Sequence, residues 1–307
     1  MPKTITPPYL KKGDQIALIA PSGLIEDEQA FIKAEQWLES LGLKSVRGKN
    51  AMKKFGTYSG TDAQRLSDLQ RAMNDPEIKA IWAVRGGYGA MRILSHLNFR
   101  LFTKHPKWLI GLSDITAFHN LWANYKIESI HGLMPIQFTR TPQPSDEALE
   151  SLKHALFGHK VSYEIKSNEL NRLGKGAGKI VGGNLSLIAG LLGTPYQLKT
   201  KGKVLFLEDV GEYSYRINRK LFSLKLAGLF DNLEGLIVGS FTDIKDSDTP
   251  FNQTINEMIL EVTHDKKYPI MFDFPAGHIQ DNRALILGRK VKLDVNEDIC
   301  NLTFKKK

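Results

Sequence analysis

The sequence predicts an α/β protein built from two domains, and three observations support this prediction. Short apolar runs alternate with amphipathic segments along most of the chain, a pattern typical of parallel strands joined by helices. Glycine-rich or small polar loops follow two of these runs, where ligands bind in open α/β sheets. The length of 307 residues exceeds that of one typical domain.

The N-terminal half gives the clearest order of elements. Gln15–Ala20 is an almost continuous apolar run, which predicts a buried strand. Glu26–Leu41 carries its apolar residues on one stripe, which predicts an amphipathic helix. The other elements expected in this half are helices over 62–73, 90–97 and 115–125 and strands over 80–84 and 108–112.

A break follows at Thr139–Ser145, where two prolines and small polar residues predict a linker that leads into a helix over Asp146–Phe157. We therefore expect a first domain over residues 1–140, a linker over 141–175 and a second domain over 176–307. The elements expected in the second domain are strands over 179–184, 203–207 and 236–240, helices ending near 192 and over 213–226 and 252–264, and short strands from 284 onward.

Composition excludes several classes of protein. The net charge is +9, but the lysines are scattered and no nucleic-acid-binding motif is present, so no nucleic-acid partner is expected. The single cysteine, Cys300, rules out an internal disulfide and a cysteine metal site. No His-Glu-x-x-His pattern occurs, so we expect neither a metal nor a cofactor.

The chain also shows no export or membrane signal. Its early apolar run, Ile16–Ala20, is too short for the core of a signal peptide, and no segment approaches the length of a membrane span. We therefore expect a cytoplasmic protein with no membrane partner.

Ser113 is the first candidate for a catalytic residue. It lies in Gly111-Leu112-Ser113-Asp114, after an apolar strand and before a helix. A sharp strand-to-helix turn would project the hydroxyl beyond the sheet, beside the free N–H groups of the helix start. The motif lacks the last glycine of Gly-x-Ser-x-Gly, and an ordinary helix cap at Ser113 or Asp114 is the alternative.

The second candidate is the glycine loop Arg85-Gly86-Gly87-Tyr88-Gly89, which follows another strand. Glycines let a backbone approach a ligand closely and offer it N–H groups. The spacing matches no nucleotide-binding loop. The loop therefore indicates either a plain tight turn or a substrate clamp and oxyanion donor beside Ser113, with Gly86, Tyr88 and Arg85 as substrate contacts.

A catalytic serine needs a base, and the base needs an acid to orient it. Two histidines are candidates for the base: His131 ends a short strand, and His278 lies in a loop dense in turn-forming residues. Glu208 and Asp209 follow the apolar strand residues 204–207, and both are candidates for the acid. These observations alone leave both choices open.

The sequence resembles the LD-carboxypeptidase family, which includes muramoyltetrapeptide carboxypeptidases and the microcin C immunity peptidase. The resemblance covers nearly the whole chain, and its strength comes from the order and spacing of short motifs. These motifs are Ala20-Pro21-Ser22, Asp62 with Arg65, Asp68-Leu69, Asp75-Pro76, the glycine loop, Gly111-Leu112-Ser113-Asp114, Gly182-Gly183-Asn184-Leu185, Leu207-Glu208-Asp209 and Gly277-His278. Family members often carry a proline near the position of Ile286, which this chain lacks.

The resemblance implies a catalytic triad of Ser113, His278 and Glu208, with an oxyanion hole from the backbone N–H groups of Asp114 and Gly87. It also implies a flavodoxin-like N-terminal domain, a smaller mixed β/α C-terminal domain and a homodimer.

The activity implied is serine-type hydrolysis of the terminal D-alanine from murein tetrapeptides during peptidoglycan recycling. Arg85, Arg216 and Arg219 are candidates for binding the terminal carboxylate. The alternatives are an immunity-type hydrolase of peptidyl- or aminoacyl-nucleotide amides and a non-catalytic binding protein on the same fold.

Overall fold

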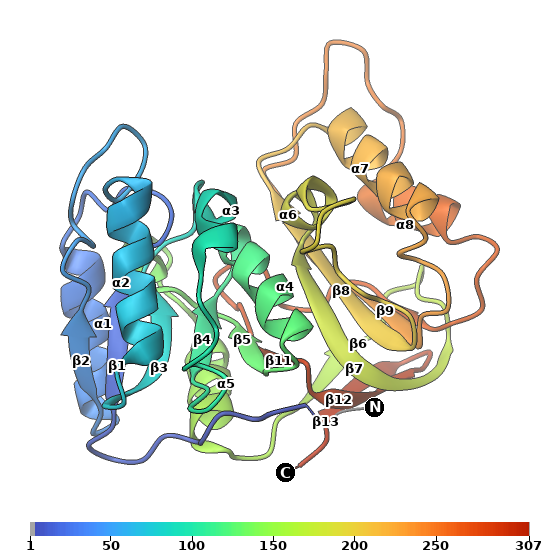
Figure 1. Ribbon diagram of the computed structural model, residues 1–307. Helices are drawn as coiled ribbons and strands as arrows, with labels where there is room; N and C mark the ends of the chain where they lie inside the picture. Colours follow the sequence, from blue (N-terminus) through green and yellow to red (C-terminus); the bar gives the residue numbers. More distant parts are fainter. Residues whose placement is uncertain (1–3, 307) are drawn as a thin grey trace. The chain divides into compact units, whose positions relative to one another are not determined.

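The computed structural model describes residues 4–306, which divide into two compact units (Figure 1). The first unit contains the described residues up to His159 together with Gln280–Leu285, and the second contains Lys160–Ile279 and the residues from Ile286 onward. The chain therefore returns briefly to the first unit before it completes the second. The domain limits at residues 140 and 175 stay a prediction.

The first unit is built on a sheet whose strand order is β11-β5-β4-β3-β1-β2, where β11 starts at Leu285, the last residue of this unit. All the pairings from β2 through β1, β3 and β4 to β5 are parallel. This is the flavodoxin-like order, in which the strand order reverses between β1 and β3, so the predicted fold class is confirmed. The strands are β1 (Gln15–Ile19), β2 (Lys44–Arg47), β3 (Ile78–Ala83), β4 (Trp108–Gly111), β5 (Ser129–His131) and β11 (Leu285–Leu287).

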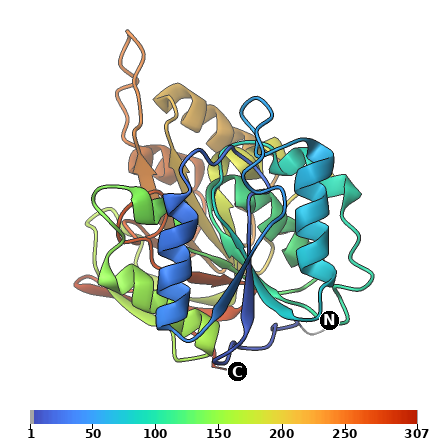
Figure 2. The same cartoon turned by 90° about the vertical axis from the view of Figure 1, so that its left-hand side faces the viewer.

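Helices lie on both faces of this sheet, and Figure 2 shows α1 and α2 on opposite sides of the strands. A central parallel strand is covered on both faces, which explains why β4 is buried at every position. Of the stripe that the sequence predicts for α1, Phe31, Ala34 and Leu38 are buried together with Ala30, whereas Leu41 follows the end of the helix and is partly exposed. The helices and 3₁₀ turns are α1 (Gln29–Ser40), α2 (Asp62–Asn74), α3 (Ala90–Ile93), η1 (Leu94–His96), η2 (Ser113–Ile115), α4 (Thr116–Asn124), η3 (Pro135–Thr139) and α5 (Asp146–Phe157).

The second unit has a mixed sheet in the order β10-β9-β8-β7-β12-β13-β6. The strands from β10 to β7 pair in parallel, and those from β7 to β6 pair antiparallel. The strands are β6 (Ser162–Lys166), β7 (Gly174–Asn184), β8 (Lys203–Val210), β9 (Gly235–Thr242), β10 (Ile270–Met271), β12 (Lys290–Val295) and β13 (Ile299–Phe304).

The core of the second unit lies between the parallel strands and three helices, of which α7 and α8 run side by side in Figure 1. Leu205 and Leu207 of β8 pack with Ile217 and Leu221 of α7 in one buried cluster. The helices are α6 (Leu185–Gly190), α7 (Ser214–Leu226) and α8 (Ile255–Val262). Across residues 4–306, no helix has the length and apolar character needed to cross a membrane.

Candidate active site

Ser113 lies directly beyond the carboxyl end of β4, in the 3₁₀ turn that precedes α4. Its φ is +63°, a left-handed conformation that is uncommon for a residue with a side chain. Such a conformation costs about 1–3 kcal/mol and is concentrated at functional sites. The alternative role as a helix cap is not seen, because the capping position is Leu112 and no side chain caps this turn.

The glycine loop passes directly beside Ser113. A Cβ atom added to Gly86 would lie 2.8 Å from the Ser113 Cβ and 3.3 Å from the Asp114 nitrogen, so only glycine fits there. Gly87 has a φ of +100°, and its Cβ would lie 3.1 Å from the Gly23 Cα. The structure therefore brings together four of the residues singled out in the sequence: Ser113, Asp114, Gly86 and Gly87.

The other two candidates in this loop differ in exposure. Tyr88 is 59% exposed, and its ring lies 5.8 Å from that of Tyr58. The Arg85 side chain is already engaged, because Nη1 donates a hydrogen bond of 2.7 Å to the Leu24 carbonyl. Tyr88 is thus accessible to a ligand, while Arg85 is bound to the loop that follows β1.

Asp114 is buried and joins the turn at Ser113 to the glycine loop. Its Oδ2 accepts a hydrogen bond of 2.7 Å from the Ala90 N–H, the first residue after the loop. Burial raises the pKa of the Asp114 carboxyl, although the Ala90 hydrogen bond and the positive charge of Arg65 oppose that rise. The Asp114 side chain therefore has a structural partner, which leaves its backbone N–H as the candidate oxyanion donor.

Two histidines of this unit are part of the core. His131 is fully buried at the end of β5. His119, on α4, is also buried, with Nδ1 2.8 Å from the Ser129 hydroxyl and Nε2 2.9 Å from the Gly111 carbonyl. Because a carbonyl can only accept, Nε2 of His119 carries the proton, and neither nitrogen is bound to Ser113.

His119 gives a prediction about stability and pH. Burial lowers the pKa of His119 from 6.5 to about 4, so the native state keeps it neutral while the unfolded chain protonates it near pH 6.5. Neutral His119 therefore has no cost in stability above pH 6.5. As the pH falls toward 4, protonation of the unfolded chain lowers the free energy of unfolding by about 3 kcal/mol in total. We expect the free energy of unfolding of His119→Gln, measured by urea titration, to change less over this range than that of the wild type. Exposed His96→Gln is the control, and parallel curves for the wild type and His119→Gln would contradict the assignment.

In the second unit, Glu208 and His278 form a buried pair. Nδ1 of His278 lies 2.8 Å from Oε2 of Glu208, whose side chain is fully buried, while the His278 side chain is 10% exposed. Because a carboxylate only accepts, Nδ1 holds the proton and Nε2 presents its lone pair. Oε1 of Glu208 has no hydrogen-bond partner among residues 4–306, so the contact with the His278 imidazole at Oε2 is the one identified for this buried carboxylate.

The backbone around Glu208 explains how this pair forms. The pairing of β8 with β9 shifts register between Leu207 and Asp209, so that Gly239 and Ser240 both stand opposite Glu208. The extra residue belongs to β9, so the ladder is interrupted directly opposite Glu208. A Cβ on Gly277 would lie 3.0 Å from the Glu208 Oε2, so the glycine before His278 permits the close approach.

Asp209, the other candidate acid, binds different partners. Its carboxylate accepts hydrogen bonds from the Asn184 amide at 2.8 Å and from the Ser186 hydroxyl at 2.6 Å. These partners lie at the start of α6, and none of them is a histidine. The two adjacent acids thus have separate partners, and only Glu208 binds an imidazole.

Two arginines considered for the substrate carboxylate stack on aromatic rings. The guanidinium carbon of Arg216 lies 5.2 Å from the centre of the Tyr213 ring, and that of Arg219 lies 5.5 Å from the Tyr215 ring. Among the described residues, no group of three or more histidine, cysteine and acidic side chains could hold a metal ion.

Comparison with known proteins identifies the family of the chain. The sequence matches the LD-carboxypeptidase N-terminal domain over residues 16–132 and the LD-carboxypeptidase C-terminal domain over residues 177–293. A probable murein peptide carboxypeptidase of Bacillus subtilis is 32% identical over 95% of this chain and 92% of its own length. A murein tetrapeptide carboxypeptidase of Pseudomonas aeruginosa is 31% identical over 92% of this chain and 94% of its own length.

Solved structures show the same fold. The crystal structure of a muramoyltetrapeptide carboxypeptidase from Oxalobacter formigenes has a TM-score of 0.86 and 28% identity, covering 94% of this chain and 98% of that one. The microcin C7 self-immunity protein MccF has a TM-score of 0.87, but its identity of 23% over 99% of both chains shows the fold alone. With the resemblance confirmed by both domains and by relatives along the whole chain, the protein belongs to the LD-carboxypeptidase family.

Proposed function

We propose that the chain hydrolyses the bond between an L-centre and the terminal D-alanine of murein tetrapeptides, with Ser113 as nucleophile, His278 as base and Glu208 as the acid that orients it. The observation that carries the proposal is the 2.8 Å contact between the His278 Nδ1 and the buried Glu208 carboxylate, which leaves Nε2 as a base. The names of the relatives that align along the whole chain support the substrate.

The proposed reaction is an acyl transfer in two stages. The Ser113 oxygen attacks the carbonyl carbon while the His278 Nε2 takes the hydroxyl proton. The C–N bond then breaks, and the leaving amine of D-alanine takes that proton from His278. In the second stage His278 takes a proton from water, the hydroxide attacks the acyl group, and the proton returns to the Ser113 oxygen as the shortened peptide leaves.

The backbone N–H groups of Asp114 and Gly87 would stabilise the negative charge on the carbonyl oxygen. The support for this role is the position of both residues beside Ser113, with Gly86 packed against its Cβ. Donors fixed before the reaction act most strongly at the charge that develops in the transition state. In this proposal Gly86, Tyr88 and Arg85 contact the substrate, and Tyr88 is the most accessible of them.

The proposal extends to a role in peptidoglycan recycling, in the cytoplasm and as a homodimer. The family resemblance supports these three points.

Product analysis tests the proposal against its alternatives. We would incubate the purified protein separately with a murein tetrapeptide, a pentapeptide and an aminoacyl sulfamoyl adenylate, and follow the products by mass spectrometry. We expect free D-alanine and the tripeptide from the tetrapeptide. Cleavage of the adenylate alone would establish the nucleotide-amide alternative, and no turnover of any substrate would favour a binding protein.

A further inference from the structure

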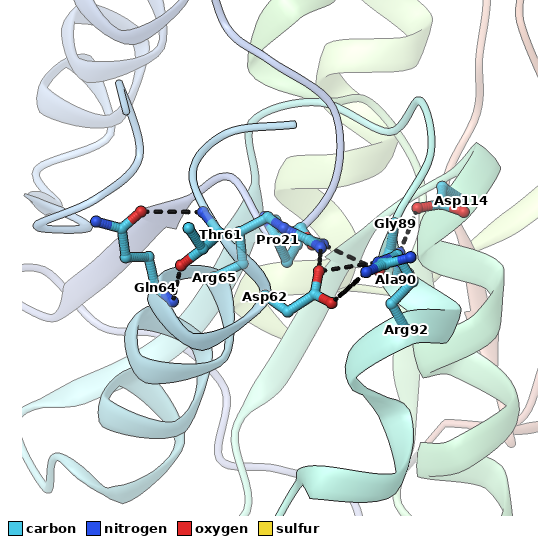
Figure 3. A network of polar contacts seen from close by, with 9 residues as sticks. All are labelled: Pro21, Thr61, Asp62, Gln64, Arg65, Gly89, Ala90, Arg92 and Asp114. Carbon is cyan, nitrogen blue, oxygen red and sulfur yellow. Dashed lines mark hydrogen bonds and ion pairs between the residues drawn. The ribbon is translucent and has the colours of Figure 1, made fainter. Parts of the chain in front are cut away.

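A buried arginine on α2 contacts the glycine loop, which lies beside Ser113, and the loop that follows β1. The Arg65 side chain has no exposed surface and lies one turn into α2. A capping box fixes the start of this helix: the Gln64 side chain accepts from the Thr61 N–H at 2.9 Å, and the Thr61 hydroxyl accepts from the Gln64 N–H at 3.3 Å (Figure 3). The Arg65 guanidinium is therefore carried by a helix whose first turn is fixed.

The contacts of Arg65 are to backbone carbonyls of the site. Nη1 donates to the Pro21 carbonyl at 2.6 Å and to the Gly89 carbonyl at 2.9 Å. Pro21 follows β1, and Gly89 is the last residue of the glycine loop, so one nitrogen joins the loops at the carboxyl ends of β1 and β3. Nη2 of the same guanidinium donates to Asp62.

The groups on both sides of the Arg65 contacts are bound by further residues (Figure 3). Asp62 also binds Arg92 of α3 in a bidentate pair, with Oδ2 2.7 Å from Nη2. The hydrogen bonds from Arg92, and then the positive charges of Arg65 and Arg92, lower the pKa of the Asp62 carboxyl. On the other side of the loop, the Ala90 N–H is held by the Asp114 carboxylate at 2.7 Å. The end of the glycine loop is therefore held between Arg65 and the residue after the nucleophile.

The packing at Gly89 shows how closely the guanidinium fits the loop. Gly89 has a φ of +131°, and a Cβ there would lie 2.6 Å from the Arg65 Nη1. A buried guanidinium is costly for stability, and an apolar side chain of similar volume often serves the fold as well. The carbonyls that Arg65 binds belong to the glycine loop, which lies beside Ser113, and to the loop after β1, whose Gly23 N–H donates to the Gly86 carbonyl at 2.9 Å. This placement points to a role of Arg65 at the candidate site.

We infer that Arg65 is a positioning residue for the reaction: it fixes the glycine loop so that the Gly87 N–H is aimed at the developing oxyanion. The inference rests on the proposed function. Lysine cannot replace this group, because an ammonium lacks the planar fork that reaches two carbonyls and a carboxylate at once.

The test is the steady-state kinetics of Arg65→Lys with the tetrapeptide. We expect kcat to fall by about 10²-fold, as when one oxyanion donor is lost, with KM within about threefold of the wild type because the donor acts in the transition state. The control is Arg71→Lys, the same change at an exposed position of the same helix, which should keep the wild-type kcat.

A second variant guards against misfolding, with circular dichroism as the check on both. Asp62→Asn removes the carboxylate that binds the Arg65 Nη2 and should give a smaller loss of kcat at unchanged KM. Wild-type kcat in a folded Arg65→Lys or Asp62→Asn enzyme, or a loss expressed only in KM, would overturn the inference. A wild-type protein that releases no D-alanine would instead refute the proposed function.

Discussion

Ser113→Ala is expected to lower kcat for release of D-alanine by about 10⁶-fold, because the nucleophile, base and acid of a triad act as a unit and the loss of the nucleophile stops acyl transfer. The residual rate would come from substrate binding and the oxyanion donors alone. The measurement is release of D-alanine from the tetrapeptide at saturating substrate, at enzyme concentrations high enough to detect the residual rate.

A second replacement separates the hydroxyl from the backbone at this position. Ser113 has a φ of +63°, which alanine must also adopt, whereas glycine adopts it at little cost. Ser113→Gly should therefore be as inactive as Ser113→Ala, since both lack the hydroxyl, while its backbone strain is relieved. The exposed Ser95→Ala is the control and should keep wild-type activity. A rate within tenfold of the wild type in either Ser113 variant would rule out this serine as the nucleophile.

The second large effect is expected at Glu208, where Glu208→Gln should lower kcat by about 10⁴-fold. A carboxylate holds the proton on the His278 Nδ1, but an amide can donate its own N–H there and stabilise the wrong tautomer. Nε2 then carries a proton and cannot accept one from Ser113. The shape of the side chain is unchanged, so the loss reports on the proton and the charge.

Asp209→Asn is the matched control for this change. It removes the same charge from the neighbouring residue, whose carboxylate binds Asn184 and Ser186. We expect reduced stability but a kcat near that of the wild type per folded molecule. If Asp209→Asn lost as much activity as Glu208→Gln, the assignment of Glu208 as the orienting acid would be wrong.

Sequence patterns predicted the parallel part of the fold well. The runs that became β1, β3 and β4 are apolar because both faces of a central strand are covered, and that continuous signal is easy to read. The helix over Asp146–Phe157 was predicted with the bounds that the structure gives. Local composition is enough to predict a helix or strand that is regular and largely buried.

Two of the strands that the sequence analysis does not predict in full lack such a signal. β2 is a short edge strand, Lys44–Arg47, with no buried residue. The first half of β7 alternates glycine with lysine or alanine, and all three residues have low strand propensity. This half pairs with β12, more than 100 residues later, where Val291 lies opposite Gly178. Pairing between distant segments cannot be read from either segment alone.

The candidate site also depends on contacts between residues that lie far apart in the sequence. The order of the motifs selected Ser113 and the glycine loop, but residue chemistry alone could not choose between His131 and His278. In the structure His131 is fully buried in the core, whereas His278 contacts Glu208, where the adjacent Gly277 permits a close approach. Arg65 was visible only as part of a motif, because its two carbonyl partners lie 44 and 24 residues away.

Mapping of an active-site label tests the central claim most directly. The purified protein would be treated with a fluorophosphonate that modifies activated serines, digested with trypsin and analysed by mass spectrometry. The tryptic peptide from Trp108 to Lys126 contains Ser113 and no other serine, so the adduct can be assigned without ambiguity. We expect one label per chain on this peptide, with loss of D-alanine release in proportion to labelling and no label in Ser113→Ala. Labelling of a different serine, or full activity in protein labelled at Ser113, would contradict the account.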